Sequence, residues 1–207
     1  MKTKLKTKTA TLPVPNLIIR LLLRHDVLLI LLAVALECFA LSPTAEAVTP
    51  APDGGSSGAN TAEGNNALFS LTTGFNNTAI GALALHQNTT GSNNTAIGAT
   101  VLYSNVDGRD NTATGTSALD FNTSGSENTA NGSEALFSNK TGNYNTATGA
   151  SALFGNVTGN FNTANGASAL HKNTTGSYNT AHGFEALYSN NPGGSNTATG
   201  ASALHSN

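Results

Sequence analysis

Two consecutive stretches of the chain decide its fold: residues 77–93 read NTAIGALALHQNTTGSN, and residues 94–110 read NTAIGATVLYSNVDGRD. Both begin with Asn-Thr-Ala and carry Gly at the fifth position, Leu at the ninth and a second Gly at the fifteenth. The same 17-residue frame recurs from Asn60 to Asn207 in nine units, without insertion or deletion. So strict a period indicates a repeat architecture in which each unit is one structural step.

Two constant positions of the repeat are its candidate structural residues. The ninth position is the candidate core column, and it holds Leu68, Leu85, Leu102, Leu119, Leu136, Leu153, Leu170, Leu187 and Leu204. The fifth position is the candidate turn column, and it holds Gly64, Gly81, Gly98, Gly115, Gly132, Gly149, Gly166, Gly183 and Gly200. Because Gly permits tight corners, we expect the chain to turn at each of these glycines.

The length of the unit selects the architecture. Helical repeats need more than about 30 residues per unit and leucine-rich repeats need about 20 or more, so a 17-residue unit is too short for either. Recurring Gly and Asn divide the unit into two short stretches, which favours a strand–turn–strand–turn coil. The sequence therefore predicts an all-β fold, a parallel β-solenoid of nine coils over residues 60–207, stacked at the ~4.8 Å spacing of paired strands. A disordered low-complexity tract is the alternative, and the strict phase of the apolar columns argues against it.

Side chains of the coil are expected to divide between inside and outside. Ala and Leu form a thin interior, and each Asn bonds its own backbone or the Asn one coil away. Columns of Asn, Thr and Ser then face outward. Aromatic residues recur at the tenth position, where we expect a stacking ladder or a contact between chains rather than a ligand cage; they are Phe69, Tyr103, Phe137, Phe154 and Tyr188.

The first 47 residues read as a signal peptide. A basic segment is followed by a mostly apolar run, Val27–Leu41, and then by Ala45-Glu46-Ala47, whose small residues fit cleavage after Ala47. A retained membrane anchor is the alternative, but charged residues interrupt any longer apolar run. Residues 48–59 are rich in Pro and Gly and are expected to form a flexible linker. The protein is therefore expected to be exported to the cell surface or beyond.

Composition excludes several functions. Of the 207 residues 10% are charged, and from Val48 onward there are three basic and eight acidic residues, so the repeat has no basic face for nucleic acid. No catalytic site is recognisable, and we expect no enzyme activity, no cofactor and no metal. His86, His171 and His205 share the tenth position but never on adjacent coils, and Asp107, Asp110 and Asp120 lack the spacing of calcium-binding β-rolls.

The pentapeptide Asn-Thr-Ala-Ile-Gly, at Asn77–Gly81 and Asn94–Gly98, resembles the Ser-Val-Ala-Ile-Gly core of head repeats in YadA-like trimeric autotransporter adhesins. The following Ala-Leu resembles their second, Ala-containing strand. The resemblance covers residues 60–207 and implies a left-handed parallel β-roll, three chains packed side by side and a binding head on the bacterial surface. The commonest repeat of that family is a few residues shorter, and here Ile fills the fourth position only at Ile80 and Ile97.

Three functions follow as expectations. The first is an adhesive head, a homotrimer joined through the small Ala columns (Ala62 to Ala198 and Ala67 to Ala203) that attaches to matrix proteins, glycans or other cells. The second is an ice- or crystal-binding surface, based on the unbroken Thr column from Thr61 to Thr197. The third is an inert fragment of a larger fibre, because no stalk, membrane anchor or cap is recognisable in the sequence. In the first case, any membrane attachment would need an anchor that this chain lacks.

Overall fold

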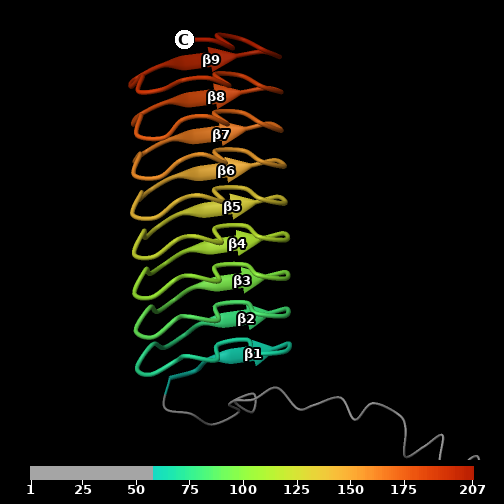
Figure 1. Ribbon diagram of the computed structural model, residues 1–207, viewed down its shortest axis with the longest axis vertical. Coiled ribbons are helices and arrows are strands. Elements are labelled where there is room, and N and C mark those ends of the chain that lie inside the picture. The colour runs from blue at the N-terminus through green and yellow to red at the C-terminus, as the bar shows by residue number, and fades with distance from the viewer. Residues whose placement is uncertain (1–57) are drawn as a thin grey trace, which may run out of the picture. The chain divides into compact units, whose positions relative to one another are not determined.

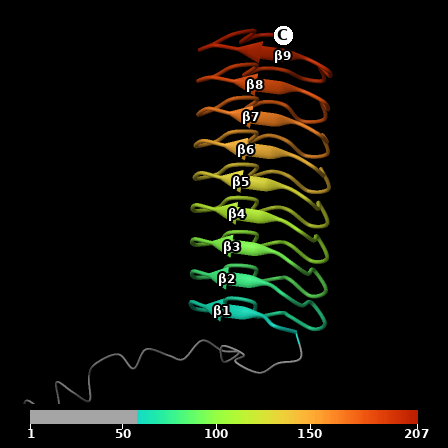
Figure 2. The same cartoon turned by 180° about the vertical axis from the view of Figure 1, so that it is seen from behind.

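The computed structural model describes residues 58–207, which form a rod of stacked coils (Figure 1). Each repeat contributes one three-residue strand: Thr61–Glu63 (β1), Thr78–Ile80 (β2), Thr95–Ile97 (β3), Thr112–Thr114 (β4), Thr129–Asn131 (β5), Thr146–Thr148 (β6), Thr163–Asn165 (β7), Thr180–His182 (β8) and Thr197–Thr199 (β9). The strands pair in parallel in sequence order, each residue beside its equivalent one coil away, as Thr129 lies beside Thr146. Seen from behind, the same stacking recurs at every level (Figure 2). The predicted parallel β-solenoid with one coil per 17 residues is confirmed.

Other predictions fall outside the described residues. They are the signal peptide (residues 1–47, with Ala45 and Ala47 at its cleavage site) and residues 48–57 of the linker. Within residues 58–207 there is no helix of the length and hydropathy that a membrane span requires.

The expectation of two strands per coil is wrong. The Ala-Leu segment is a succession of turns, because its Leu and the residue two positions earlier have left-handed backbone conformations, with φ of 54° at Leu136 and 57° at Glu134. An extended strand does not accommodate such residues. Hydrogen bonds between coils nevertheless continue through the turns: the N–H of Leu136 donates to the carbonyl of Ala152 at 2.9 Å.

Glycine is required at the fifth position by both conformation and space. Gly132 has a φ of 141°, a backbone conformation that residues other than Gly rarely adopt. A Cβ at Gly132 would also lie 2.6 Å from the carbonyl oxygen of Gly149 in the next coil. The coils therefore approach one another closely at this corner.

The interior holds one Leu, two Ala and two Asn from a typical coil. In the fifth repeat these are Leu136, Ala130, Ala135, Asn128 and Asn139, all of them buried. Eight of the nine repeat leucines are likewise inside, whereas Leu204 in the last coil is 51% exposed. The expectation that the Asn columns face outward is wrong for the first and twelfth positions, because both columns find hydrogen-bond partners within the rod.

Candidate interaction surfaces

Two ladders of buried amides hold the coils in register. In the first ladder, the backbone N–H and side-chain amide of Asn94 both donate to Oδ1 of Asn77, at 3.0 and 3.1 Å. In the second, the amide of Asn105 donates to Oδ1 of Asn88 at 2.8 Å. The carbonyl of Gly108 accepts from both Asn94 and Asn105, so it ties the two ladders together within one coil. Outward side chains are thereby placed at fixed intervals along the rod.

The strands present a polar face to solvent. In each strand the middle Ala points inward, while the Thr before it and the residue after it point outward. The Thr column is unbroken over nine coils, but the column beside it changes from coil to coil. Its members are Glu63, Ile80, Ile97, Thr114, Asn131, Thr148, Asn165, His182 and Thr199. The regular part of this face is therefore a single column of threonines.

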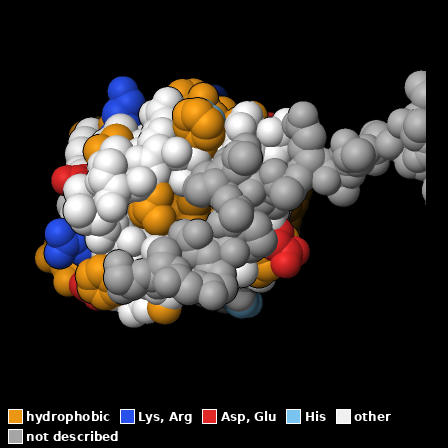
Figure 3. All heavy atoms as spheres, turned by 90° about the horizontal axis from the view of Figure 1, so that it is seen from below, with side chains coloured by type: hydrophobic (Ala, Val, Ile, Leu, Met, Phe, Trp, Pro, Cys, Tyr) orange, Lys and Arg blue, Asp and Glu red, His pale blue; other side chains and the backbone are white. Residues whose placement is uncertain are grey.

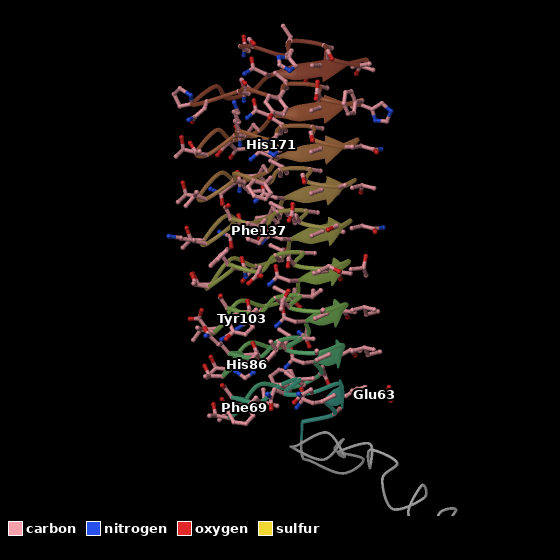
Figure 4. The ribbon with its side chains drawn as sticks, turned by 45° about the vertical axis from the view of Figure 1, so that its right-hand side comes forward. Glu63, Phe69, His86, Tyr103, Phe137 and His171 are labelled. Atoms are coloured by element: carbon pink, nitrogen blue, oxygen red, sulfur yellow. The ribbon has the colours of Figure 1, made fainter. Side chains whose placement is uncertain are left out.

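The tenth position forms a ladder of stacked rings on another side of the coil, away from Glu63 of the strand face (Figure 4). Phe69 stacks on His86 and His86 on Tyr103, with ring centroids 5.2 and 5.1 Å apart. Stacking resumes at Phe137 and continues through Phe154, which lies 5.0 Å away. The upper series then runs through His171, Tyr188 and His205 at 4.9–5.0 Å. The expected ladder is present, and it also includes His86, His171 and His205, which were not predicted as its members.

One coil breaks this ladder. The fourth repeat carries Asp120 at the tenth position, between Tyr103 and Phe137 on the adjacent coils. The next residue, Phe121, instead meets Phe137 edge to face, with centroids 5.0 Å apart and planes at 85°. The ring column is therefore divided into a lower series of three and an upper series of five.

A second aromatic column lies at the seventeenth position. Tyr144, Phe161 and Tyr178 stack with centroids 4.8 and 5.0 Å apart, and all three are exposed. A hydrogen bond from Tyr144 to Glu127, together with the negative charge of Glu127, raises the pKa of the phenol. This column was not predicted, although the sequence has an aromatic residue at the same position of three successive units.

The three histidines of the tenth-position ring ladder have different surroundings. Burial lowers the pKa of His171, and the charge of Lys172 lowers it further, while Glu134 and Glu185 act in the opposite direction. Nδ1 of His171 is buried without a hydrogen-bond partner among the described residues. By contrast, Nδ1 of His86 lies 3.1 Å from the carbonyl oxygen of Asn66, and Nε2 of His205 lies 3.6 Å from a carboxylate oxygen of Glu185.

Charged groups are sparse over the part of the chain that the structure describes. In the view from below, acidic and basic side chains stand as separate groups among polar and hydrophobic ones (Figure 3). Asp110 accepts a hydrogen bond from the amide of Asn93 at 2.9 Å, and Asp107 is exposed on the preceding turn. No three His, Cys, Asp or Glu residues within 58–207 are grouped so that they could hold a metal ion.

The Ala columns do not lie on any of these surfaces. Ala79 and Ala84 in the second coil, like their equivalents in the central coils, are buried inside their own rod. The expectation that these columns bring neighbouring chains together is wrong, because a side chain that fills its own core is not available to a partner. Side chains exposed for contact include those of the Thr column and of the aromatic column Tyr144, Phe161 and Tyr178. Comparison of the chain with known protein families, with curated proteins and with solved structures finds no match.

Proposed function

We propose that the repeat region is a non-enzymatic adhesive module that attaches to surfaces, matrix or other cells by many weak contacts. The observation that carries this proposal is the register of the rod: the same outward group returns on every coil, as the nine threonines of β1 to β9 do. Contacts repeated on one rigid body act together, and their joint avidity can far exceed the affinity of each. A regular rod is suited to this kind of attachment.

Export and cell-surface attachment are part of the same proposal. The pattern of residues 1–47 supports secretion, and the resemblance to YadA-like heads supports a place on the cell surface. Intact-mass analysis of protein recovered outside the cell is expected to give a chain that begins at Val48. A chain beginning at Met1 would contradict cleavage.

Self-association into a homotrimer also belongs to the proposal. Its contact surface is an aromatic column and not the Ala columns that were expected from the sequence. The exposed column of Tyr144, Phe161 and Tyr178 offers apolar area that two or three rods could share. Sedimentation equilibrium of the protein is expected to give a trimer, and replacing Phe161 with Ser is expected to weaken it. A stable monomer would contradict this part of the proposal.

The adhesive function is tested by changing the number of coils. Truncation after Tyr178 removes the last two coils, residues 179–207, and leaves the column of Tyr144, Phe161 and Tyr178 in place. If binding is multivalent, the shortened rod should dissociate much faster than the parent from immobilised matrix proteins, glycan arrays or cells. Equal dissociation of both rods would contradict multivalent attachment.

An ice- or crystal-binding surface is the second candidate, and the unbroken threonine column favours it. Only β4, β6 and β9 carry Thr on both sides of the inward Ala, so a two-column threonine array is interrupted. Thermal hysteresis separates the two candidates. A clear gap between the melting and freezing points of ice in a solution of the folded protein supports ice binding, and the absence of a gap supports adhesion.

A further inference from the structure

The break in the aromatic ladder leaves one ring face without a stacking partner. Tyr103 stacks on His86 below it, and no ring among residues 58–207 stacks on its other face. The next ring of the column, Phe137, makes a T-shaped contact with Phe121. Two coil steps of ~4.8 Å separate the levels of Tyr103 and Phe137, an interval of about 10 Å in which no ring of the described residues stacks on Tyr103.

Asp120 occupies the level between these two rings. Its coil is held between its neighbours by backbone hydrogen bonds, from Ser104 N–H to the Asp120 carbonyl at 2.9 Å and from Phe121 N–H to the Phe137 carbonyl at 3.1 Å. The carboxylate is half-buried and has neither a hydrogen bond nor an ion pair within the described part of the chain. Partial burial raises the pKa of Asp120, as expected for a carboxylate that has lost water and gained no partner.

A ring face without a stacked ring, one coil away from an unpaired carboxylate, is complementary to a planar cation. The guanidinium group stacks on aromatic rings and forms paired hydrogen bonds with a carboxylate, whereas an ammonium group is compact and strongly hydrated. A cation over an aromatic ring is attracted by the negative face of the ring, and the attraction grows as the site is desolvated. The weak negative charge of the repeat region also favours a basic ligand.

We propose that Tyr103, Asp120 and Phe121 form a binding site for the guanidinium group of an arginine side chain on a partner protein. The guanidinium stacks on the free face of Tyr103 and pairs with the carboxylate of Asp120, and Phe121 borders it on the side of Phe137. This inference deepens the proposed adhesive function by naming the chemistry of one contact. It lies outside residues 179–207, so the truncation described above leaves it intact and the two proposals can fail separately.

The test is an NMR titration of the isotope-labelled protein with N-acetyl-arginine amide. Saturable shifts are expected for the amides of Tyr103, Asp120 and Phe121. N-acetyl-citrulline amide has a planar but neutral head group and is expected to cause no saturable shift, and N-acetyl-lysine amide is expected to bind at least about tenfold more weakly, because it cannot make the paired contact. Equal binding of citrulline or lysine, or no saturable shift with arginine, would overturn the proposal.

Two variants locate the site. Asp120→Asn keeps the shape of the side chain and is expected to weaken arginine binding at least about tenfold, because the charge-assisted pair is lost. Asp107→Asn removes an exposed carboxylate from the adjacent coil and is expected to leave binding unchanged. Circular dichroism and the unfolding midpoint check that both variants are folded. Equal affinity of the Asp120 variant and the parent would show that the arginine binds elsewhere.

Discussion

Oδ1 of Asn77 accepts two hydrogen bonds from Asn94 in the next coil, one from its backbone N–H at 3.0 Å and one from its side-chain amide at 3.1 Å. The same pair of contacts recurs from Asn60 to Asn179 along the rod. A buried amide without partners would destabilise the fold, but here each side-chain oxygen and nitrogen is used. The interior of the rod is therefore stabilised by polar ladders as well as by its thin apolar column.

The first prediction tests this polar interior. The amide of Asn128 donates to the carbonyl of Gly142 at 2.8 Å, and its oxygen accepts from Asn145. Asn128→Asp replaces the donor with an acceptor that faces that carbonyl, and we expect a loss of stability on the order of 3 kcal/mol. The urea unfolding midpoint measures it. Asn131→Asp, at an exposed position of the same coil, is expected to change stability by less than about 0.5 kcal/mol. Equal effects of the two substitutions would show that the buried ladder adds nothing to stability.

The second prediction concerns the leucine column. Leu136 is fully buried at the centre of the rod, so Leu136→Ala is expected to cost about 2–5 kcal/mol through lost burial and the cavity left behind. Leu204→Ala is the matched control, because the same residue of the repeat is about half exposed there. Urea unfolding followed by circular dichroism should show a clear loss for the first variant and a much smaller one for the second. A similar loss in both would mean that burial of the leucine does not determine its contribution.

The third prediction is a pH dependence at Asp120. Burial raises the pKa of this carboxyl above its ordinary value of 3.8, so the folded protein binds more protons than the unfolded chain just above that pH. Stability therefore falls as the pH rises through this window, and the ionised group remains unfavourable at pH 7. Asp120→Asn is expected to raise stability at pH 7 by less than about 1 kcal/mol, since the group is half exposed to solvent. The difference between variant and parent should shrink as the pH approaches 3.8, and a difference that stays constant with pH would exclude this explanation.

The fourth prediction is a pH dependence of the opposite sign at His171. Its pKa lies below the ordinary 6.5, chiefly because of burial, so below pH 6.5 the unfolded chain takes up a proton that the folded ladder resists. Stability contributed by the neutral ring is therefore lost as the pH falls through 6.5 and below. His171→Phe copies the residue of the preceding coil, Phe154, and is expected to reduce the loss of stability between pH 7.5 and 5.5.

The control for His171 is another histidine. His182→Asn is the matched variant, because it removes an exposed imidazole from the strand face, where other coils carry Asn. Thermal unfolding at the two pH values measures both variants. If His171→Phe and the parent lose equal stability on acidification, the carboxylates of the rod rather than this imidazole cause the loss.

Periodicity made the solenoid predictable, because a 17-residue interval with Leu and Gly in constant phase admits one coil per repeat. The number of strands was not predictable in the same way. Leu136 and its equivalents adopt a left-handed conformation that Leu disfavours on its own, and it is imposed by the closure of a short coil. Local preferences therefore suggested a second strand where the structure has turns.

Among the site residues, too, those that depend only on the repeat phase were predictable, and those that depend on contacts between coils were not. The aromatic column at the tenth position was visible in the sequence, since it needs only the repeat phase. The buried Asn columns were misjudged because residue type alone favours an exposed amide, whereas their partners come from a neighbouring coil. A site at Asp120 could not be predicted from one repeat, because it depends on the stacking of three coils, with Tyr103 below Asp120 and Phe137 above it.

Each strand of the rod pairs only with the strands before and after it, and most hydrogen bonds between coils recur from one junction to the next. Recombination between two repeats of the gene would therefore add or remove whole coils without disturbing the remaining ones. Lineages that carry this sequence have a simple genetic route to rods of different reach, in steps of ~4.8 Å. A change in repeat number would then alter the length of the rod and leave the chemistry of its surfaces as it was.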